Sequence, residues 1–319
     1  WHLGIRDKKL LCIIREMLKA PIVMLNGETV YPTKGTPQGG ILSPLLSNIV
    51  LNELDWWIAS QWENMPTTYE YKCEIRPNGT KNKSPIYGAF RNTTNLKEVY
   101  IVRYADDFKL FCRKRSDAEK VFIAVKQWLN ERLKLEVSEE KSKIINLKRH
   151  YSEFLGFELK AVKKRKGYVV RSHITPKAIA RETDKLIEQV KQIASTKDRD
   201  DEVKQITLYN SMVFGIHNYY CFATMVATDC EKIHRNVSIV MKNRLYGRLK
   251  KKGTINEVYI RKQYRDSKQI RFVSSKTVCP VGYIKTKTPM FKKKKVCKYT
   301  VEGREEIHKN LKVNTSIML

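Results

Sequence analysis

Two adjacent carboxylates have the residue types and the setting of a metal site. Asp106 and Asp107 stand between the alternating apolar run 99–104 and a second run, 108–112, so we expect them at the tip of a β-hairpin. Two acidic side chains this close repel each other unless a cation lies between them. Mg²⁺ prefers oxygen ligands of this kind, and two such ions can hold both reacting oxygens of a phosphoryl transfer. A solvated turn rich in Asp is the alternative.

A glycine-rich loop ahead of a helix is the second candidate site. The loop, 35–42, contains Gln38, and Ser43 followed by Pro44 predicts a helix that begins there with Ser43 as its cap. Apolar residues at every fourth position predict the buried face of this helix: Leu46, Val50, Leu54 and Ile58. Glycines let the backbone approach a ligand closely, and a helix N-terminus favours phosphate. Alternatively, the segment is only a tight loop before a core helix.

Together, the two motifs resemble those of the reverse transcriptases encoded by group II introns. The resemblance rests first on TPQGGILSP at 36–44 and YADD at 104–107. The segments SEEKSK at 138–143 and FLGF at 154–157 resemble the next two blocks of that family's palm. The segment GIHNYY at 215–220 is similar to the family's thumb, which is also called the maturase domain or domain X. The resemblance therefore covers nearly the whole chain.

The resemblance implies an α+β fold, with part of a right-hand polymerase palm followed by an α-helical thumb/maturase (domain X) bundle. We expect the palm in 1–172, the thumb in 173–250 and a basic extension in 251–319, part of which resembles the family's tail. This extension should be loosely ordered and tied down only in part, around 278–284. Helical periodicity predicts three helices in the thumb: 179–194, 203–224 and 228–249. By contrast, 66–98 is polar with little periodicity, which predicts a surface excursion.

Local sequence signals predict several element boundaries. Asn26-Gly27 predicts a hairpin turn, and Asp7 is of the type that caps a helix. Thr175 before Pro176 predicts a helix start. Two further helix starts follow from the capping-box pattern, with Ser116 and Glu119 in one and Thr228 and Glu231 in the other.

The resemblance also implies a role for each motif residue. Asp106 would ligate both metal ions, and Asp107 would support the metal site. Lys141 would approach the leaving pyrophosphate, where its charge offsets developing negative charge, and Lys143 is the competing residue for this role. The nucleotide- and template-binding residues would be Pro37, Gln38, Gly39, Gly40, Tyr104 and Ala105. The primer-binding residues would be Phe154, Leu155 and Gly156, unless this segment is a plain turn between core strands.

The charge of the chain indicates a polyanionic partner. The formal net charge is +29, from 62 Lys and Arg against 33 Asp and Glu. The basic residues are spread along the chain instead of lining one amphipathic helix, which argues against a membrane surface. Two clusters are expected to contact RNA phosphates: Lys163, Lys164, Arg165 and Lys166 at a hairpin tip, and Lys242, Arg244, Arg248, Lys250, Lys251 and Lys252 at a helix end.

Apolar runs and cysteines bear on the location of the protein. No apolar run approaches the roughly 20 residues needed to span a bilayer, and no signal peptide opens the sequence. The seven cysteines lack paired C-x-x-C spacing, which is typical of reduced thiols and not of a zinc site. We therefore expect a cytoplasmic protein with no membrane partner, and the resemblance implies a bacterial one.

The resemblance implies an RNA-directed DNA polymerase that also acts as an intron maturase in splicing and in retrohoming by target-primed reverse transcription. Its cofactor would be Mg²⁺, and its partners group II intron RNA, a DNA or RNA primer and deoxynucleoside triphosphates. Two alternatives remain open. One is an RNA-binding splicing maturase without polymerase activity. The other is an RNA-dependent RNA polymerase, which shares a palm with an acidic hairpin.

A further expectation concerns the second catalytic carboxylate. In polymerases of this fold the other essential Asp lies on a strand well upstream of the glycine-rich loop, whereas Asp7 is the one Asp before Gly35 and fits a helix cap better. We therefore expect a fragment that lacks the fingers and the first catalytic Asp block and that ends before any endonuclease domain. Alone, it should bind RNA but not extend a primer.

Overall fold

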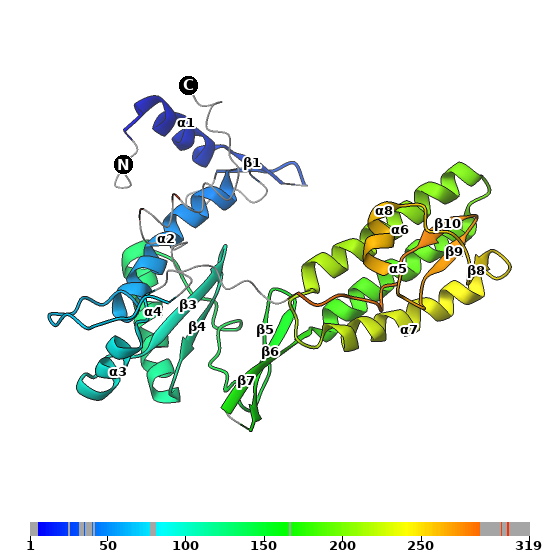
Figure 1. The fold of residues 1–319 in the computed structure, drawn as a ribbon. Helices are drawn as coiled ribbons and strands as arrows, with labels where there is room; N and C mark the ends of the chain where they lie inside the picture. The colour runs from blue at the N-terminus through cyan, green and yellow to red at the C-terminus, as the bar shows by residue number, and fades with distance from the viewer. Residues whose placement is uncertain are drawn as a thin grey trace. The chain divides into compact units, whose positions relative to one another are not determined.

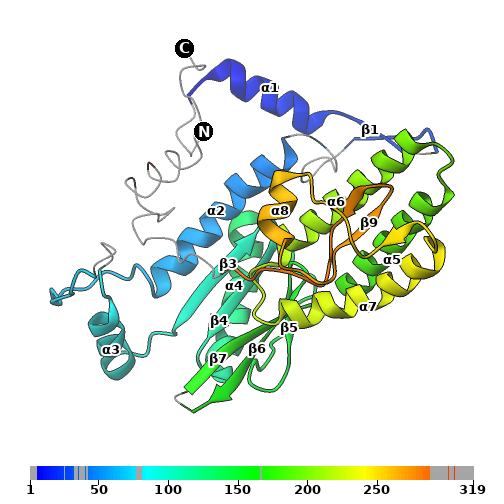
Figure 2. The same ribbon diagram turned by 45° about the vertical axis from the view of Figure 1, so that its right-hand side comes forward.

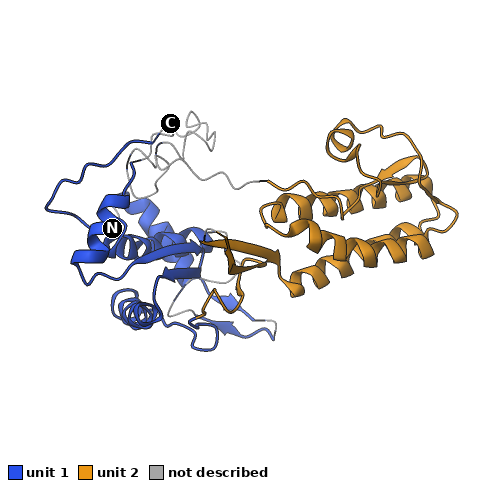
Figure 3. Cartoon of the chain, turned by 60° about the horizontal axis from the view of Figure 1, so that its bottom comes forward, with its two compact units in different colours: residues 1–144, 292–319 blue, residues 145–291 orange. Residues whose placement is uncertain are grey.

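The computed structural model describes residues 6–24, 26–31, 35, 40, 42–76, 81–165, 167–287, 301 and 305. Helices and antiparallel strands occur along these ranges (Figure 1 and Figure 2), which confirms the α+β class. The chain divides into two compact units, 1–144 with 292–319 and 145–291 (Figure 3). Each unit has a hydrophobic core of its own. Within the described ranges, no helix has the length and apolar character that crossing a membrane requires.

The first unit contains four helices and two hairpins among its described residues. They are α1 (Lys8–Lys19), β1 (Ile22–Val23), β2 (Thr29–Val30), α2 (Ser43–Gln61), α3 (Ser84–Thr93), β3 (Val99–Tyr104), β4 (Asp107–Cys112) and α4 (Arg115–Leu133). Asp7 caps α1, as predicted, because its carboxylate accepts from the backbone N–H groups of Lys9 and Leu10 at 2.9 and 3.2 Å. The predicted hairpin at Asn26-Gly27 is also confirmed, with Ile22 paired to Val30.

The buried face of α2 is only partly the one predicted. Leu54 and Ile58 are buried, but Val50 is 44% exposed. A helix turns 100° per residue, so positions spaced by four drift around the helix by about 40° at each step and cannot share one face for long. The buried residues instead mix spacings of three and four: Leu51, Leu54, Asp55, Ile58 and Ala59. The helix starts within one residue of the prediction, but Leu42 and not Ser43 occupies the N-cap position.

The segment 66–98 is not wholly the surface excursion that was predicted, because it contains α3. Pro85 lies in the first turn of this short helix, and Phe90 is buried. Trp62, which is fully buried, packs against Phe90 and stacks on Tyr87, with ring centroids 5.5 and 5.6 Å apart. Its indole N–H also donates to the Tyr100 hydroxyl at 3.1 Å. A helix this short shows too few turns for its periodicity to be read from sequence.

The second unit joins a three-stranded sheet to a helical bundle. Its elements are β5 (Ser152–Phe154), β6 (Phe157–Lys164), β7 (Gly167–Ile174), α5 (Pro176–Ser195), α6 (Arg199–Tyr220), α7 (Val226–Arg244), β8 (Leu249–Lys250), α8 (Val258–Tyr264), β9 (Arg271–Val273) and β10 (Lys276–Val278). The three predicted helices are confirmed, with ends that differ by a few residues. The boundary between the two compact units falls at 144/145, before β5. The sheet β5–β7 therefore belongs to the same unit as α7, against which β7 packs.

Of the three other predicted helix caps, the one at Thr175 is confirmed, whereas the two capping boxes do not form. Thr175 caps α5, with its hydroxyl accepting from the N–H of Ala178 at 3.3 Å. Helix α4 begins at Arg115 and α7 at Val226, so neither predicted capping box forms. In α4, Glu119 instead pairs with Arg115 one turn earlier, at 2.8 Å. Glu119 could form either the capping box or an (i, i+4) ion pair, and the sequence pattern alone did not decide between them.

The extension packs over a longer stretch than predicted, because its buried residues begin well before the expected contact region 278–284. Ile260, Tyr264 and Val273 are fully buried against the bundle. Asn210 pairs with this segment as a strand would, donating to the Thr277 carbonyl at 2.7 Å and accepting from the Cys279 N–H at 2.8 Å. The apolar residues lie in very short elements among lysines, so the sequence has no long periodic pattern from which their burial could be predicted.

His217 predicts a pH dependence of this packing. Its Nε2 is 2.8 Å from the Val281 carbonyl, so it carries the proton and donates, while Nδ1 accepts from the Tyr264 hydroxyl at 2.7 Å. Burial lowers the pKa of His217, as it lowers that of His234. The two histidines therefore take up protons at a higher pH in the unfolded chain than in the folded chain. Their contribution to the free energy of unfolding is full above the ordinary histidine pKa of about 6.5 and is lost as the pH falls below it.

We expect the unfolding temperature to fall between about pH 7 and pH 5, and the His217→Gln variant to show a shallower fall. His234→Gln serves as the companion variant, since it removes only the other shifted histidine. A His217→Gln profile parallel to wild type would show that His217 does not couple folding to pH.

Candidate active site and nucleic-acid interface

The acidic residues lie at the tip of the β3–β4 hairpin, as predicted. Tyr104 pairs with Asp107, so the connection is the two-residue turn Ala105-Asp106, and Asp107 is the first residue of β4. Asp106 and Asp107 are both exposed. Ala105 has φ 52°, a left-handed conformation that costs an L-residue about 1–2 kcal/mol. Such strain persists only where neighbouring contacts hold the backbone in place.

A buried arginine holds this turn, and the sequence analysis did not identify it. The Arg103 guanidinium donates to both carboxylate oxygens of Asp55 on α2, at 3.1 and 2.8 Å. It also donates to the Asn48 side-chain oxygen at 2.8 Å and to the Ala105 carbonyl at 2.7 Å. A signal was present, because alternation places Arg103 on the same strand face as Val99 and Ile101, where a charge needs a partner.

The carboxylates suit a hard divalent cation in chemistry but do not form a closed site. Two Asp side chains supply oxygen ligands, and ions such as Mg²⁺ often bind through one or two carboxylates while retaining waters or substrate phosphates. Among the residues that the structure describes, no group of three or more His, Cys, Asp or Glu side chains is placed to hold a metal.

Lys141 and Gly40 lie within the described part of the first unit, whereas three other predicted residues of its glycine-rich loop do not. Lys141 is exposed in the turn 139–141, and no hydrogen bond or ion pair between these described residues joins it to Asp106 or Asp107. Gly40 is half-buried, and its carbonyl accepts from the N–H of Ser43 at 3.1 Å. Pro37, Gln38 and Gly39 lie outside the described residues.

Comparison with known proteins identifies the family. Residues 2–159 match the reverse transcriptase (RNA-dependent DNA polymerase) family. The chain is 28% identical over 275 residues to the group II intron-encoded protein LtrA of Lactococcus lactis subsp. cremoris, which covers 70% of this chain and 45% of that protein. This chain belongs to the group II intron reverse transcriptases and maturases.

Two further relatives extend this comparison. The chain is 27% identical over 177 residues to a putative COX1/OXI3 intron 2 protein of Saccharomyces cerevisiae, covering 49% of this chain and 21% of that protein. It is 28% identical over 165 residues to the protein YkfC of Escherichia coli, covering 51% of this chain and 42% of that protein. The chain thus spans less than half the length of each of these relatives.

In the second unit, the predicted primer-binding segment forms a tight turn. Phe154 pairs with Phe157, and both turn residues have positive φ, 52° at Leu155 and 77° at Gly156. The Tyr219 hydroxyl donates to the Leu155 carbonyl at 2.9 Å. A Cβ on Gly156 would lie 3.2 Å from the Tyr220 hydroxyl oxygen, so glycine lets the end of α6 pack here. A primer contact at this turn stays a prediction.

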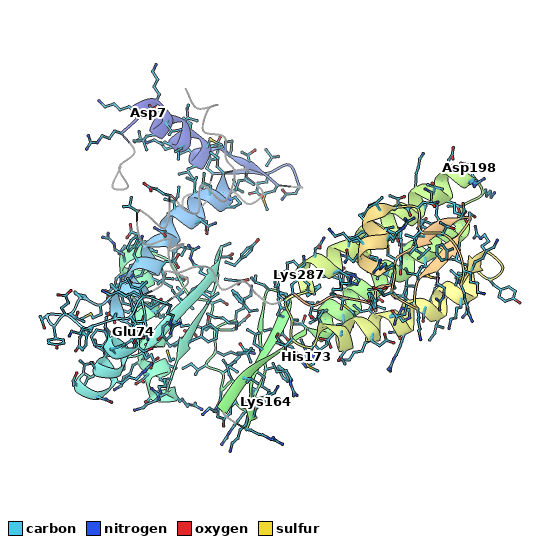
Figure 4. All side chains as sticks on the ribbon, in the orientation of Figure 1. Asp7, Glu74, Lys164, His173, Asp198 and Lys287 are labelled. Atoms are coloured by element: carbon cyan, nitrogen blue, oxygen red, sulfur yellow. The ribbon has the colours of Figure 1, made fainter. Side chains whose placement is uncertain are left out.

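The first basic cluster lies at the tip of the β6–β7 hairpin. Figure 4 shows Lys164 at the end of this hairpin that is farther from His173. Lys163, Lys164 and Arg165 are exposed, whereas Lys166 lies outside the described residues. An aromatic ring accompanies them, since Tyr168 is 52% exposed, pairs across the strands with Lys163 and has the Lys148 ammonium 4.5 Å from its ring centroid.

The second basic cluster is exposed except at one member. Lys242 and Arg244 close α7, and Lys250, Lys251 and Lys252 follow it, all exposed. Arg248 differs, because its guanidinium pairs with Glu202 at 2.9 Å and donates to the Ala194 carbonyl at 2.8 Å. Its donors thus serve the bundle, and we omit Arg248 from the candidate RNA surface.

Proposed function

We propose that the protein serves a group II intron as its RNA-directed DNA polymerase and maturase. The observation that carries the proposal is an exposed Asp106-Asp107 hairpin tip in a chain of the reverse transcriptase family. Asp106 would ligate the divalent ions and Asp107 would support the site. Mg²⁺, when bound, would stabilise charge on the attacking and leaving oxygens of nucleotide transfer. Lys141 would offset charge on the pyrophosphate.

The proposal divides the chain by function, with a palm that continues past the unit boundary at 144/145 and includes most of β5–β7. Residues 1–172 would form part of the palm, 173–250 the thumb or maturase bundle, and 251–319 a basic extension. The loop residues Pro37, Gln38, Gly39 and Gly40, with Tyr104 and Ala105, would contact nucleotide and template. Phe154, Leu155 and Gly156 would meet the primer. The partners would be group II intron RNA, a DNA or RNA primer and deoxynucleoside triphosphates, in splicing and in retrohoming.

Primer extension on an RNA template tests this function and separates its alternatives. A protein that contains this chain and all the polymerase blocks of the family is assayed with either deoxynucleotides or ribonucleotides. We expect Mg²⁺-dependent DNA synthesis from deoxynucleotides. Synthesis from ribonucleotides would favour an RNA polymerase, and splicing assistance without synthesis a pure maturase.

RNA binding is expected to weaken steeply with salt. Each phosphate contacted by Lys or Arg releases counterions, so the logarithm of the affinity falls with the logarithm of salt by roughly 0.7 to 0.9 per contact. Neutralising Lys163, Lys164 and Arg165 to Gln should reduce this slope by about 2 or more if all three meet phosphates.

The matched control removes the same charge from exposed helix positions, as Lys177→Gln, Lys191→Gln and Lys204→Gln. Affinities are measured by filter binding across low and moderate salt concentrations. A flat salt dependence of the wild-type chain, or equal slopes for both triple variants, would contradict the proposed hairpin contact.

A further inference from the structure

Arg103 makes more hydrogen bonds than the burial of a strand residue requires. Its guanidinium uses four of its five N–H donors, two on Asp55, one on Asn48 and one on the Ala105 carbonyl. The side chains of Arg103 and Asp55 are 7% and 0% exposed. The neighbours of Arg103 on the same strand face, Val99 and Ile101, are apolar members of the core, so an apolar residue would suit this position for packing alone.

Stability alone does not account for this ion pair. Desolvation of two buried charges cancels most of their attraction, and a hydrophobic pair of similar volume often serves a core equally well. The contact that an apolar residue could not replace is the one to the turn. Arg103 binds the carbonyl of Ala105, the residue with the strained left-handed φ, and thereby ties the acidic turn to α2.

The charge of Asp55 explains how an arginine can lie beside a metal-binding turn. A lone guanidinium next to Asp106 and Asp107 would pair with them and compete with a divalent cation for the same oxygens. Here the bidentate contact with Asp55 directs two of its N–H donors away from the turn and neutralises the charge. The guanidinium can then hold the backbone of the turn while both aspartates remain exposed.

We propose that Arg103 is a positioning residue for the acidic turn and that Asp55 acts as its counter-charge, which leaves Asp106 and Asp107 free for a divalent cation. This inference rests on the proposed metal-binding role of the two aspartates. The positioning contact itself does not require a metal. It connects the YADD hairpin with α2, the helix that follows the glycine-rich loop in sequence.

Hydrogen exchange tests the positioning contact without metal or substrate. In Arg103→Lys the charge is kept but the fork of donors is lost, and we expect the amides of 104–107 to exchange at least about tenfold faster. Amides in α4 should keep their wild-type rates, which shows that the unit remains folded. Wild-type exchange in the turn of Arg103→Lys would overturn the proposal.

Mn²⁺ binding, followed by electron paramagnetic resonance, tests the counter-charge. Asp55→Asn frees the arginine to pair with the turn, so its Mn²⁺ affinity should fall about tenfold or more, and adding Arg103→Gln should restore part of that loss. The double variant leaves no buried charge and is the folded comparison if Asp55→Asn alone unfolds. Mn²⁺ affinity in Asp55→Asn equal to wild type, or no recovery in the double variant, would overturn the role of Asp55.

Asp106→Asn separates this inference from the proposed function, since this variant should no longer bind Mn²⁺. If Asp106→Asn binds Mn²⁺ as wild type does, the metal-binding role fails and the counter-charge role of Asp55 falls with it. The exchange measurement on the turn still decides the positioning role of Arg103.

Discussion

Replacing Asp106 with Asn is expected to lower the rate of RNA-templated extension by a factor of about 10³ or more, in a protein that carries all the polymerase blocks. A neutral amide oxygen binds a hard divalent ion far less well than a carboxylate does. Metal ions contribute several kcal/mol to phosphoryl transfer, and each 1.4 kcal/mol or so corresponds to about tenfold in rate. The fold should be unaffected, because Asp106 is an exposed turn residue.

The measurement is the single-turnover extension rate together with the unfolding temperature. Asp184→Asn is the matched control, since it makes the same chemical change at an exposed position of α5 in the other unit. Its rate should equal that of wild type. Extension by Asp106→Asn at the wild-type rate would show that Asp106 is not a metal ligand. A variant that loses extension but still assists splicing would separate the proposed polymerase activity from the proposed maturase activity.

The acidic hairpin could be predicted because its signals are local. Alternation on both sides of Asp106-Asp107 defines two strands, and a connection this short leaves little freedom of register. The helices α5 to α7 are long enough for periodicity to identify them, and Thr175 before Pro176 fixes one start. In each case the residues that determine the element are neighbours in sequence.

The contacts that hold the candidate site could not be predicted in the same way. Asp55 and Arg103 lie on different elements, and nothing in the spacing of α2 marks an aspartate as the partner of a residue on β3. The C-terminal segment shows the same limit, since Asn210 and His217 bind backbone groups of 277–281 that only the folded chain brings near. A charged or polar residue on a predicted buried face signals that a partner exists without naming it.

Asp229 carries the largest expected effect on stability. Its side chain is fully buried, and one carboxylate oxygen accepts from the backbone N–H of Ile174 at 3.0 Å. The same carboxylate contacts Nδ1 of His173 at 3.1 Å and the ammonium of Lys232 at 3.2 Å. Asp229 lies in the first turn of α7, whereas its contacts at 173 and 174 are the last residues of β7, so it links the sheet to the bundle.

Asp229→Ala is expected to destabilise the second unit by about 3–5 kcal/mol, the usual cost of removing one partner of a buried charged network. The substitution leaves the buried N–H of Ile174 without its acceptor, and burial keeps water from replacing it fully. Asp229→Asn keeps the size and one acceptor oxygen, so its loss should be smaller. Hydrogen exchange of amides in α5 to α7 during urea titration reports the free energy of this unit.

Asp266→Ala provides the control for the loss of an aspartate. Asp266 is 64% exposed and pairs with Arg265 at 3.4 Å, and exposed pairs contribute only about 0–1 kcal/mol. The contrast with Asp229 therefore measures burial and connectivity and not the loss of a carboxylate as such. If Asp229→Ala were no more destabilising than Asp266→Ala, the link between β7 and α7 would have to lie in the apolar contacts of the core, and the buried carboxylate would be dispensable for folding.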